Sequence, residues 1–315
     1  MQIVLPGALP DAAIAQELAS HLEKNAPHLA TWLAGAQADI IPAAPADTFC
    51  TPYEYWLLRR HGFKANDSQR PSAGLAAVQA RNTGMAAAAD APLWLGQLVH
   101  VAPSRDGAAM IPGGELEITP EESAALFDSA AEYVTGSGFT ATPFDTLHWR
   151  LTPPPDYQPA CASPALVSIT SVNDWWTQDA EGRPWRRLVN ELQMLWFDHP
   201  VNQQRESRGL RPINSVWLYG GAAPAQLAAA PATLADPPQV LRALHGPALV
   251  QDWGSWLQEL EKLDREVFAS LNAMPRLVLT GNNRIVELTP AKPGFLARLF
   301  GGHKQNWRRW WSAHN

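Results

Sequence analysis

Cysteine and charged residues are both scarce in this chain of 315 residues. The two cysteines, Cys50 and Cys161, are far apart, and the chain has neither a CxxC pair nor the cysteine spacing of a disulfide framework. This usage fits a reducing compartment, so we expect a cytoplasmic protein. Charged residues make up 17% and hydrophobic residues 46% of the chain, which argues against global disorder and predicts a sizeable core.

Basic residues are too few for a general nucleic-acid-binding protein. The formal net charge is −6, whereas a protein that neutralises phosphates needs a basic face. No apolar run approaches the length of a membrane-spanning helix. The first residues, MQIVLPGALPD, contain no Lys or Arg and do not read as a signal peptide. We therefore predict neither a nucleic-acid partner nor a membrane span.

The motifs of common catalytic sites are missing as well. The nine histidines are scattered without an HxH or HExxH pattern, and no P-loop, GxGxxG or GxSxG sequence occurs. Such motifs hold metals, phosphates or an activated nucleophile. We therefore predict no metal site, no cofactor and no catalytic residue.

Tryptophan, by contrast, is abundant. The fourteen Trp residues predict either a strongly aromatic core or an aromatic pocket. Trp175 and Trp176 precede an acidic turn, and Trp185 follows it. These rings are predicted to pack over the helix that begins at Pro184, or alternatively to form an aromatic lid.

The first 88 residues predict mostly helices. Apolar residues recur at helical spacing in 11–23, and Thr51-Pro52 supplies a cap followed by Pro at the first helical position. Two further stretches have helical character, 26–34 and 71–80.

Strands and helices are interspersed after residue 89. Strands are predicted at 93–101, 115–118, 147–151, 166–169 and 213–219, with a hairpin at 277–279 and 285–288. Helices are predicted at 119–136, 184–197 and 252–271. The order of these elements predicts an α/β, mixed α+β fold, in which a mixed parallel and antiparallel sheet is flanked by helices.

These patterns divide the chain into a mostly helical region (1–88), a mixed α/β core (89–291) and a basic, aromatic C-terminal tail (292–315). A basic amphipathic tail is able to bind an acidic membrane surface. The preferred interpretation is instead a terminal helix docked on the body, and we expect the core to fold without it.

The segment 190–222 concentrates the residues that resemble a binding site. A predicted helix ends at His199-Pro200, a polar turn follows, and a buried strand leads into two glycines. Asn offers a donor and an acceptor, Arg a planar fork of donors, and glycine permits close approach of the backbone. The candidate ligand-binding residues are Asn202, Arg205, Arg208, Asn214, Gly220 and Gly221.

The same residues have a structural alternative. Asn202 and Asn214 are suited to satisfying backbone groups at the corner between helix and strand. Arg205 would then pair with Glu191 or Glu206. If the residues form a site instead, its ligand is expected to be a small phosphorylated or carboxylated compound.

Seven segments carry a resemblance to a known family. They read PYEYWLL, LWLGQLVHVAPSRDG, LEITPEES, LHWRL, NELQML, HPVNQQRESRG and PINSVWLYGG, and they run from about Pro52 to Gly221. The last three are specific in combination. On these segments the chain resembles the bacterial RpfE-like regulatory proteins, which are also described as predicted cofactor-independent phosphoglycerate mutase-like.

A wider resemblance is to the archaeal-type cofactor-independent phosphoglycerate mutases, whose inserted substrate domain carries a similar stretch. In this chain it reads His199, Pro200, Val201, Asn202, Arg205, Gly209, Asn214 and then Gly220-Gly221. The resemblance implies a mixed α/β sandwich. Those enzymes transfer the phosphoryl group in another domain, with a nucleophilic Ser and two metals held by Asp and His, and we find no matching residues in this sequence.

Three functions follow as expectations. The leading one is a non-catalytic, cytoplasmic, phosphoglycerate mutase-like protein with a regulatory role, which binds a small anionic ligand. The second is an enzyme acting on phosphorylated three-carbon acids, with Arg205 and Arg208 as clamps. The third is a peripheral membrane or protein-partner module that uses the C-terminal tail, although no particular protein partner is indicated.

Overall fold

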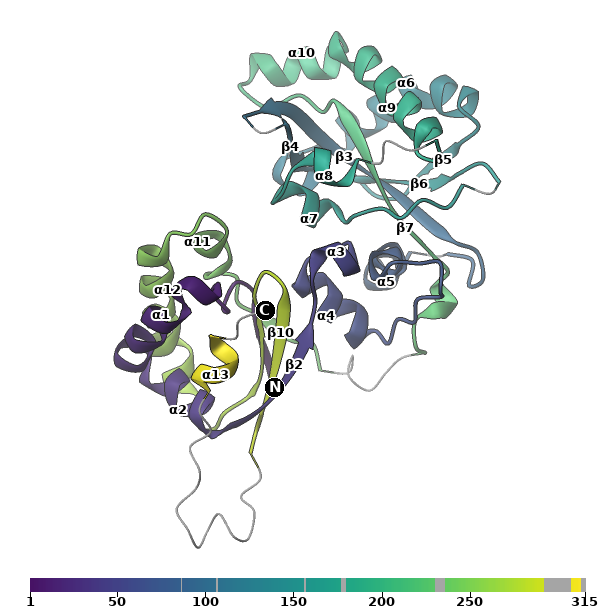
Figure 1. The fold of residues 1–315 in the computed structure, drawn as a ribbon. Coiled ribbons are helices and arrows are strands. Elements are labelled where there is room, and N and C mark those ends of the chain that lie inside the picture. Colours follow the sequence, from purple (N-terminus) through teal and green to yellow (C-terminus); the bar gives the residue numbers. More distant parts are fainter. Residues whose placement is uncertain are drawn as a thin grey trace, which may run out of the picture. The chain divides into compact units, whose positions relative to one another are not determined.

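The computed structural model describes residues 1–85, 87–105, 107–155, 157–176, 180–229, 236–291 and 307–312. It divides into unit 1, made of Met1–Pro45 and Ala232–Asn315, and unit 2, made of Ala46–Pro231. Both chain ends, purple and yellow in Figure 1, belong to unit 1. The boundary expected at residue 88 marks a change from predicted helices to predicted strands, and the one at residue 291 marks the start of the basic tail. The two units follow instead the pairing of strands from opposite ends of the chain.

Unit 1 contains a mixed five-stranded sheet in the order β2-β10-β9-β1-β8. Strand β1 lies between β9 and β8 and pairs in parallel with both, and β10 pairs antiparallel with β9 and β2. The strands are β1 (Gln2–Leu5), β2 (Ala36–Pro42), β8 (Gln239–Val240), β9 (Arg276–Thr280) and β10 (Arg284–Pro290).

Helices pack on this sheet through one continuous apolar core. The long helix α12 presents Trp256, Leu260 and Leu263 to that core at helical spacing. Its buried Asp264 accepts backbone hydrogen bonds from His28 and Leu29, at the start of α2. The helices of unit 1 are α1 (Ala12–Asn25), α2 (Pro27–Gly35), α11 (His245–Leu249), α12 (Trp253–Glu266), η5 (Phe268–Ser270) and α13 (Arg308–Trp311).

The described part of the C-terminal tail, 307–312, packs into the core of unit 1. Trp307, Trp310 and Trp311 are all buried there, and Arg308 forms a bidentate pair with Glu23 of α1. Arg284 of β10 donates to the carbonyl oxygen of Trp311 over 2.9 Å. These rings are therefore part of the core of unit 1, which argues against the expectation that the core folds without the tail. The other tail residues lie outside the described residues.

Unit 2 is built on an antiparallel sheet centred on the long strand β3. β6 pairs with the first half of β3, β4 with its second half, and β7 with Leu93–Val99. β5 in turn pairs with β6. The strands are β3 (Leu93–Ser104), β4 (Gly107–Pro112), β5 (Thr140–Pro143), β6 (His148–Thr152) and β7 (Ser215–Ala222).

Helices cover both faces of this sheet. One face packs with α6 and α9 through a core that includes Trp149, Val216 and Leu218. On the other face Val99 and Trp217 pack with α7 and α8. The helices of unit 2 are α3 (Pro45–Thr48), α4 (Pro52–Arg60), η1 (Pro71–Gly74), α5 (Leu75–Thr83), η2 (Gly113–Glu115), α6 (Pro120–Gly136), α7 (Pro164–Ser168), α8 (Val172–Trp175), α9 (Arg183–Phe197), α10 (Pro200–Ser207) and η3 (Pro224–Gln226).

The predicted fold class is confirmed: the chain is mixed α/β, with parallel and antiparallel strand pairs flanked by helices. The helix starts read from caps are also confirmed. Thr51 and Thr119 each accept a hydrogen bond from the backbone N–H three residues on, and a Glu completes each capping box. Among the described residues no helix combines the length and apolar character needed to cross a membrane.

Three predicted elements are wrong. The strand expected at 166–169 is helix α7, because Ser163 caps it and Pro164 occupies its first position. The strand expected at 115–118 is a turn after η2. The polar turn after His199-Pro200 contains helix α10, again with Pro at its first position. Strands β2, β4, β5 and β8 were not predicted.

Candidate functional site

The corner predicted from the sequence joins α9, α10 and β7. His199 separates the two helices and caps the second, because its Nδ1 accepts a hydrogen bond from the backbone N–H of Val201 over 3.2 Å. Pro200 has no N–H to donate and suits the first position of α10. Helix α10 then carries Asn202 and Arg205 into the interior and leaves Arg208 at its end.

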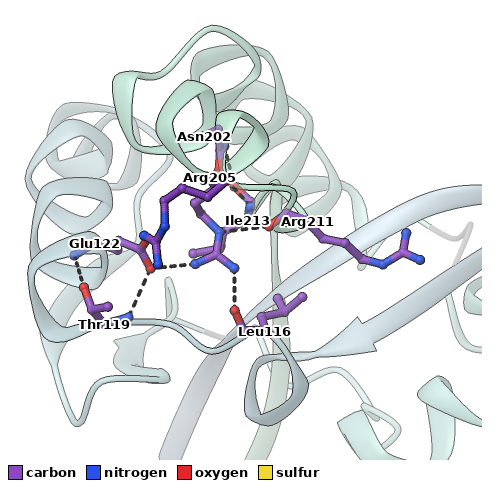
Figure 2. Close-up of polar contacts among 8 residues, drawn as sticks. Leu116, Thr119, Glu122, Asn202, Arg205, Arg211 and Ile213 are labelled. Carbon is purple, nitrogen blue, oxygen red and sulfur yellow. Dashed lines mark hydrogen bonds and ion pairs between the residues drawn. The ribbon is translucent and has the colours of Figure 1, made fainter.

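Arg205 has no exposed side-chain surface. Its Nη1 lies 2.6 Å from a carboxylate oxygen of Glu122, its Nε donates to the carbonyl oxygen of Arg211 over 2.8 Å, and its Nη2 donates to that of Leu116 (Figure 2). The same oxygen of Glu122 accepts the backbone N–H of Thr119 in the capping box of α6. The guanidinium therefore joins α10 to the start of α6, and its charge is neutralised within the protein.

The side chain of Asn202 is also buried, and both the nitrogen and the oxygen of its amide form hydrogen bonds. Its Nδ2 donates to the carbonyl oxygens of Trp196 and Ile213, and its Oδ1 accepts the backbone N–H of Ile213, each over 2.8 Å. One side chain thus ties the end of α9 to the residues that lead into β7. Figure 2 shows its contact with Ile213.

The remaining candidates lie along β7. The Asn214 amide accepts from the backbone N–H of Val101 and donates to its carbonyl oxygen, both over 2.8 Å, so it substitutes for a residue of a strand pair. Gly220 and Gly221 have φ of +101° and +106°. A side chain at Gly220 would meet the carbonyl oxygen of Leu93 at 2.6 Å, so this position requires glycine.

The six candidates therefore occupy three places. Asn202, Arg205 and Arg208 all belong to α10 or its C-terminal cap, and the two arginines meet Glu122, with Arg208 60% exposed and its Nη1 3.7 Å from that carboxylate. Asn214 faces β3, and the two glycines lie at the other end of β7. The partner of Arg205 is Glu122 rather than Glu191 or Glu206, and Glu191 pairs with Arg187 instead.

A cavity of about 230 Å³ lies between α8, α9 and the strands β3 and β7. Trp217 is held in place there, since its Nε1 donates to the carbonyl oxygen of Ala162 over 2.9 Å. The Trp176 ring packs against it at a centroid distance of 5.6 Å. The cavity is lined by Val101, Val172, Asn173, Trp176, Val189, Asn190, Gln193, Ser215 and Trp217.

The polar side chains of this cavity are uncharged; Asn173 and Asn190 lie at its exposed rim, and Ser215 is buried. Within the part of the chain that the structure describes, the side chains of Asn173, Asn190, Gln193 and Ser215 form no hydrogen bond with another residue. Together they offer amide and hydroxyl donors and acceptors beside apolar and aromatic walls. Such a lining is suited to an uncharged group that has its own donors and acceptors.

Elsewhere in unit 2, Asp145 and His148 are engaged with each other. Burial would raise the pKa of Asp145, but hydrogen bonds from the His148 ring and from the backbone of Leu147 and His148 hold it below its ordinary value. The other ring nitrogen of His148 lies 2.9 Å from the amide nitrogen of Gln97, so the pair does not face an open space.

The two thiols are poor nucleophiles. Burial raises the pKa of Cys161 to about 12, and burial together with the charge of Glu54 raises that of Cys50 well above its ordinary value. Across the described ranges, no group of three or more His, Cys, Asp or Glu side chains is placed to hold a metal ion.

Comparison with known proteins yields distant structural likenesses. No protein-family model and no curated protein matches the chain. Among solved structures, it is similar to the cofactor-independent phosphoglycerate mutase from Thermoplasma acidophilum DSM 1728, with 15% identity, a TM-score of 0.34, and coverage of 91% of this chain and 88% of that chain. It is also similar to the PH0037 protein from Pyrococcus horikoshii, with 14% identity, a TM-score of 0.41, and coverage of 91% and 86%.

The cavity residues were missed in the sequence for a physical reason. Asn190 and Gln193 lie on the polar side of an amphipathic helix, a pattern that ordinarily marks a solvated face. Asn173 and Ser215 stand alone in the sequence. The sequence does single out one residue of the cavity lining. Trp176 belongs to the aromatic lid that is one of the two predictions for these rings, and it lines the cavity.

Proposed function

We propose that this chain is a non-catalytic, regulatory protein that acts by binding an uncharged polar ligand in the cavity between α8, α9, β3 and β7. We also propose that it works in the cytoplasm and is related to the RpfE-like regulatory proteins that its sequence resembles. The binding role is argued from the cavity, and the relationship from the sequence segments that carry the resemblance.

The observation that carries the proposal is the set of unused amide and hydroxyl groups in the cavity lining. Polar side chains that line a cavity beside aromatic walls and have no partner within the protein are available to a ligand. The corner around Arg205 has the opposite character, because its donors are engaged by Glu122 and by two carbonyl oxygens.

Ligand-observed NMR with a library of neutral amide- and alcohol-bearing fragments tests this proposal. We expect binding by fragments that combine an amide with an apolar ring, and loss of that binding in Gln193→Ala and Asn190→Ala. Gln203→Ala is a matched control, because Gln203 is exposed on α10 and outside the cavity lining. If no neutral fragment binds, or if both cavity variants retain binding, the cavity is not a ligand site.

The second candidate is an anion site at the surface of the corner. Arg208 is 60% exposed and Arg211 is also exposed, so both guanidinium groups are accessible to a phosphate or carboxylate. This candidate includes the enzymatic alternative, a protein that acts on phosphorylated three-carbon acids. An assay for interconversion of 2- and 3-phosphoglycerate, with and without manganese, distinguishes it: activity lost in Arg208→Ala would favour the enzyme over the non-catalytic protein.

A further inference from the structure

The cavity of unit 2 combines planar amides with indole rings. Helix α9 supplies Asn190 and Gln193, which are three residues apart and therefore lie on one side of the helix. The strands β3 and β7 supply Val101 and Trp217, and the end of α8 supplies Trp176. A ligand in this cavity therefore meets hydrogen-bonding groups from the helix and flat apolar surfaces from the two tryptophans.

The polar side chains of the lining differ in depth. Ser215, at the start of β7, is only 2% exposed, and its hydroxyl forms no hydrogen bond with another residue that the structure describes. Gln193 is half-buried, and Asn173 and Asn190 are exposed at the rim. Hydrogen-bonding groups are thus available from the buried end of the cavity to its mouth.

Asn173 is positioned by a glycine of the neighbouring strand. A side chain at Gly107, the first residue of β4, would meet the amide carbon of Asn173 at 2.9 Å. The hydroxyl of Ser171 donates to the carbonyl oxygen of Ala108 over 3.4 Å, which ties α8 to the same strand. Packing rather than hydrogen bonding therefore positions the rim amide, and its donor and acceptor stay available.

The size and lining of the cavity favour a flat heteroaromatic ring. Sites for drug-sized molecules usually enclose roughly 300–1,000 Å³. The cavity here is smaller, about 230 Å³, and suits a single ring system. Nucleobases stack on aromatic side chains through their faces, and Asn and Gln amides form paired hydrogen bonds with their edges. An amide matches such an edge because its donor and acceptor lie side by side in one plane.

The charge around the cavity disfavours a phosphate on this ligand. None of the described residues that line it is charged. Asp174, next to the rim residue Asn173, is acidic and exposed. A phosphate at the mouth would therefore lack a cation to bind and would lie near a carboxylate. The rim amides are suited instead to uncharged hydroxyl groups, such as those of a ribose.

We infer that the cavity binds a neutral heteroaromatic base, either free or as its nucleoside. The ring stacks beside Trp176 and Trp217, its edge meets Gln193 and Ser215, and the ribose of a nucleoside lies at the rim. This inference rests on the proposed function and names the chemical class of its ligand.

NMR titration of the full-length protein tests the inference with a defined panel. The panel contains adenine, cytosine, adenosine, cytidine and adenosine monophosphate, with a saturated lactam and glucose as neutral compounds that lack an aromatic ring. We expect at least one base or nucleoside to bind about tenfold or more tightly than the lactam and glucose, because only the bases stack on the indole rings. Adenosine monophosphate is expected to bind more weakly than adenosine.

Substitutions at Trp176 separate stacking from simple filling of the cavity. Trp176→Leu is expected to weaken binding of the base by about tenfold or more, whereas Trp176→Phe keeps an aromatic face and is expected to retain most of the affinity. Gln203→Ala, outside the cavity lining, is expected to bind as the unmodified protein does. Thermal unfolding of each variant shows whether it is folded, and the comparison of ligands on the unmodified protein does not depend on the variants.

The inference is overturned if the bases and nucleosides bind no more tightly than the lactam and glucose, if folded Trp176→Leu binds them unchanged, or if adenosine monophosphate binds more tightly than adenosine. Binding of neutral amide fragments that is lost in Gln193→Ala and Asn190→Ala would in these cases leave the proposed function standing. Failure of every neutral compound to bind would remove both.

Discussion

From the sequence, Arg205 is expected either to bind a ligand or to pair with Glu191 or Glu206. Its side chain is fully buried and pairs with Glu122, which precedes it by 83 residues. Removing one partner of a buried ion pair leaves the other charge uncompensated and typically costs about 3–5 kcal/mol. We expect Arg205→Ala to lower the free energy of unfolding by about that amount, measured by urea denaturation.

Arg208→Ala is the matched control for Arg205→Ala. Arg208 is 60% exposed and lies 3.7 Å from the same carboxylate, and such an exposed pair contributes at most about 1 kcal/mol. Equal effects of the two substitutions would contradict the structural role assigned to Arg205.

The residue types of this corner could be read from the sequence, but their partners could not. Asn and Arg after a helix end indicate a polar corner, and Asn202 and Asn214 do satisfy backbone groups there, as one of the two sequence interpretations had it. Glu122 could not be identified as the partner of Arg205, because it belongs to a distant helix that only the folded chain brings near. The four polar residues of the cavity likewise share no pattern in the sequence, because only the folded chain brings α8, α9 and β7 together.

The buried side chain of His61 makes the stability of the folded protein depend on pH. It is 3% exposed, and burial, followed by the charges of Arg81 and Arg60, lowers its pKa to about 4. The pKa of a histidine in an unfolded chain is near 6.5. Between pH 6.5 and 4 the unfolded chain therefore binds a proton at this residue, whereas the folded chain does not. The folded state is therefore expected to lose stability as the pH falls through this window, by at most about 1.4 kcal/mol per pH unit from this residue.

His61→Leu is expected to reduce this loss, because it removes the group that protonates on unfolding. Urea denaturation at a series of pH values between 7 and 4 measures the slope. His21→Leu is the control, since His21 is exposed on α1. An unchanged slope in His61→Leu would contradict the assignment.

At the scale of elements, the sequence was most informative where a cap stood beside a proline. The starts of α4 and α6 were predicted from Thr51-Pro52 and Thr119-Pro120, because these interactions lie within one helical turn. The strand β2 was missed because it pairs with β10, from the other end of the chain, and its apolar residues do not alternate regularly. Local chemistry predicts helix ends, but strand pairing depends on distant partners.

Helix α13 is a short element that contributes to the core out of proportion to its length. Trp311 is 1% exposed, and its ring packs 6.3 Å from that of Trp256. Replacing a buried Trp with Ala typically costs about 3–5 kcal/mol. We expect Trp311→Ala, and removal of residues 307–315, to destabilise unit 1 by at least about that amount, observed as a lower midpoint in thermal unfolding followed by circular dichroism.

Arg308→Gln is the control for this prediction. It removes the exposed pair with Glu23 and the contact of the guanidinium with the Trp307 ring, and is expected to change stability by at most about 1 kcal/mol. Unaltered unfolding after removal of residues 307–315 would show that the tail is dispensable, as the sequence had suggested.

At the scale of the whole molecule, the two units differ in how the chain builds them. Unit 2 is a continuous segment, Ala46–Pro231, whose antiparallel sheet and covering helices come from neighbouring stretches. Unit 1 needs both ends of the chain, since β1 pairs with β8 and β9 and β2 pairs with β10. The sequence predicted the mixed α/β class correctly, but not this arrangement, because the composition of a strand does not reveal which distant strand it joins.

This difference predicts unequal behaviour of fragments. A fragment of residues 46–231 retains all five strands of its sheet and the helices on both faces, so it is expected to fold alone with one cooperative thermal transition. A fragment of residues 1–45 retains β1 and β2 but none of their partners, and its two helices lose α12 and the buried Asp264 that binds the start of α2. It is expected to remain unfolded by circular dichroism and to gain structure when residues 232–315 are added. A fragment 46–231 without a cooperative transition, or a folded fragment 1–45, would show that the division into these two units does not describe how the chain is stabilised.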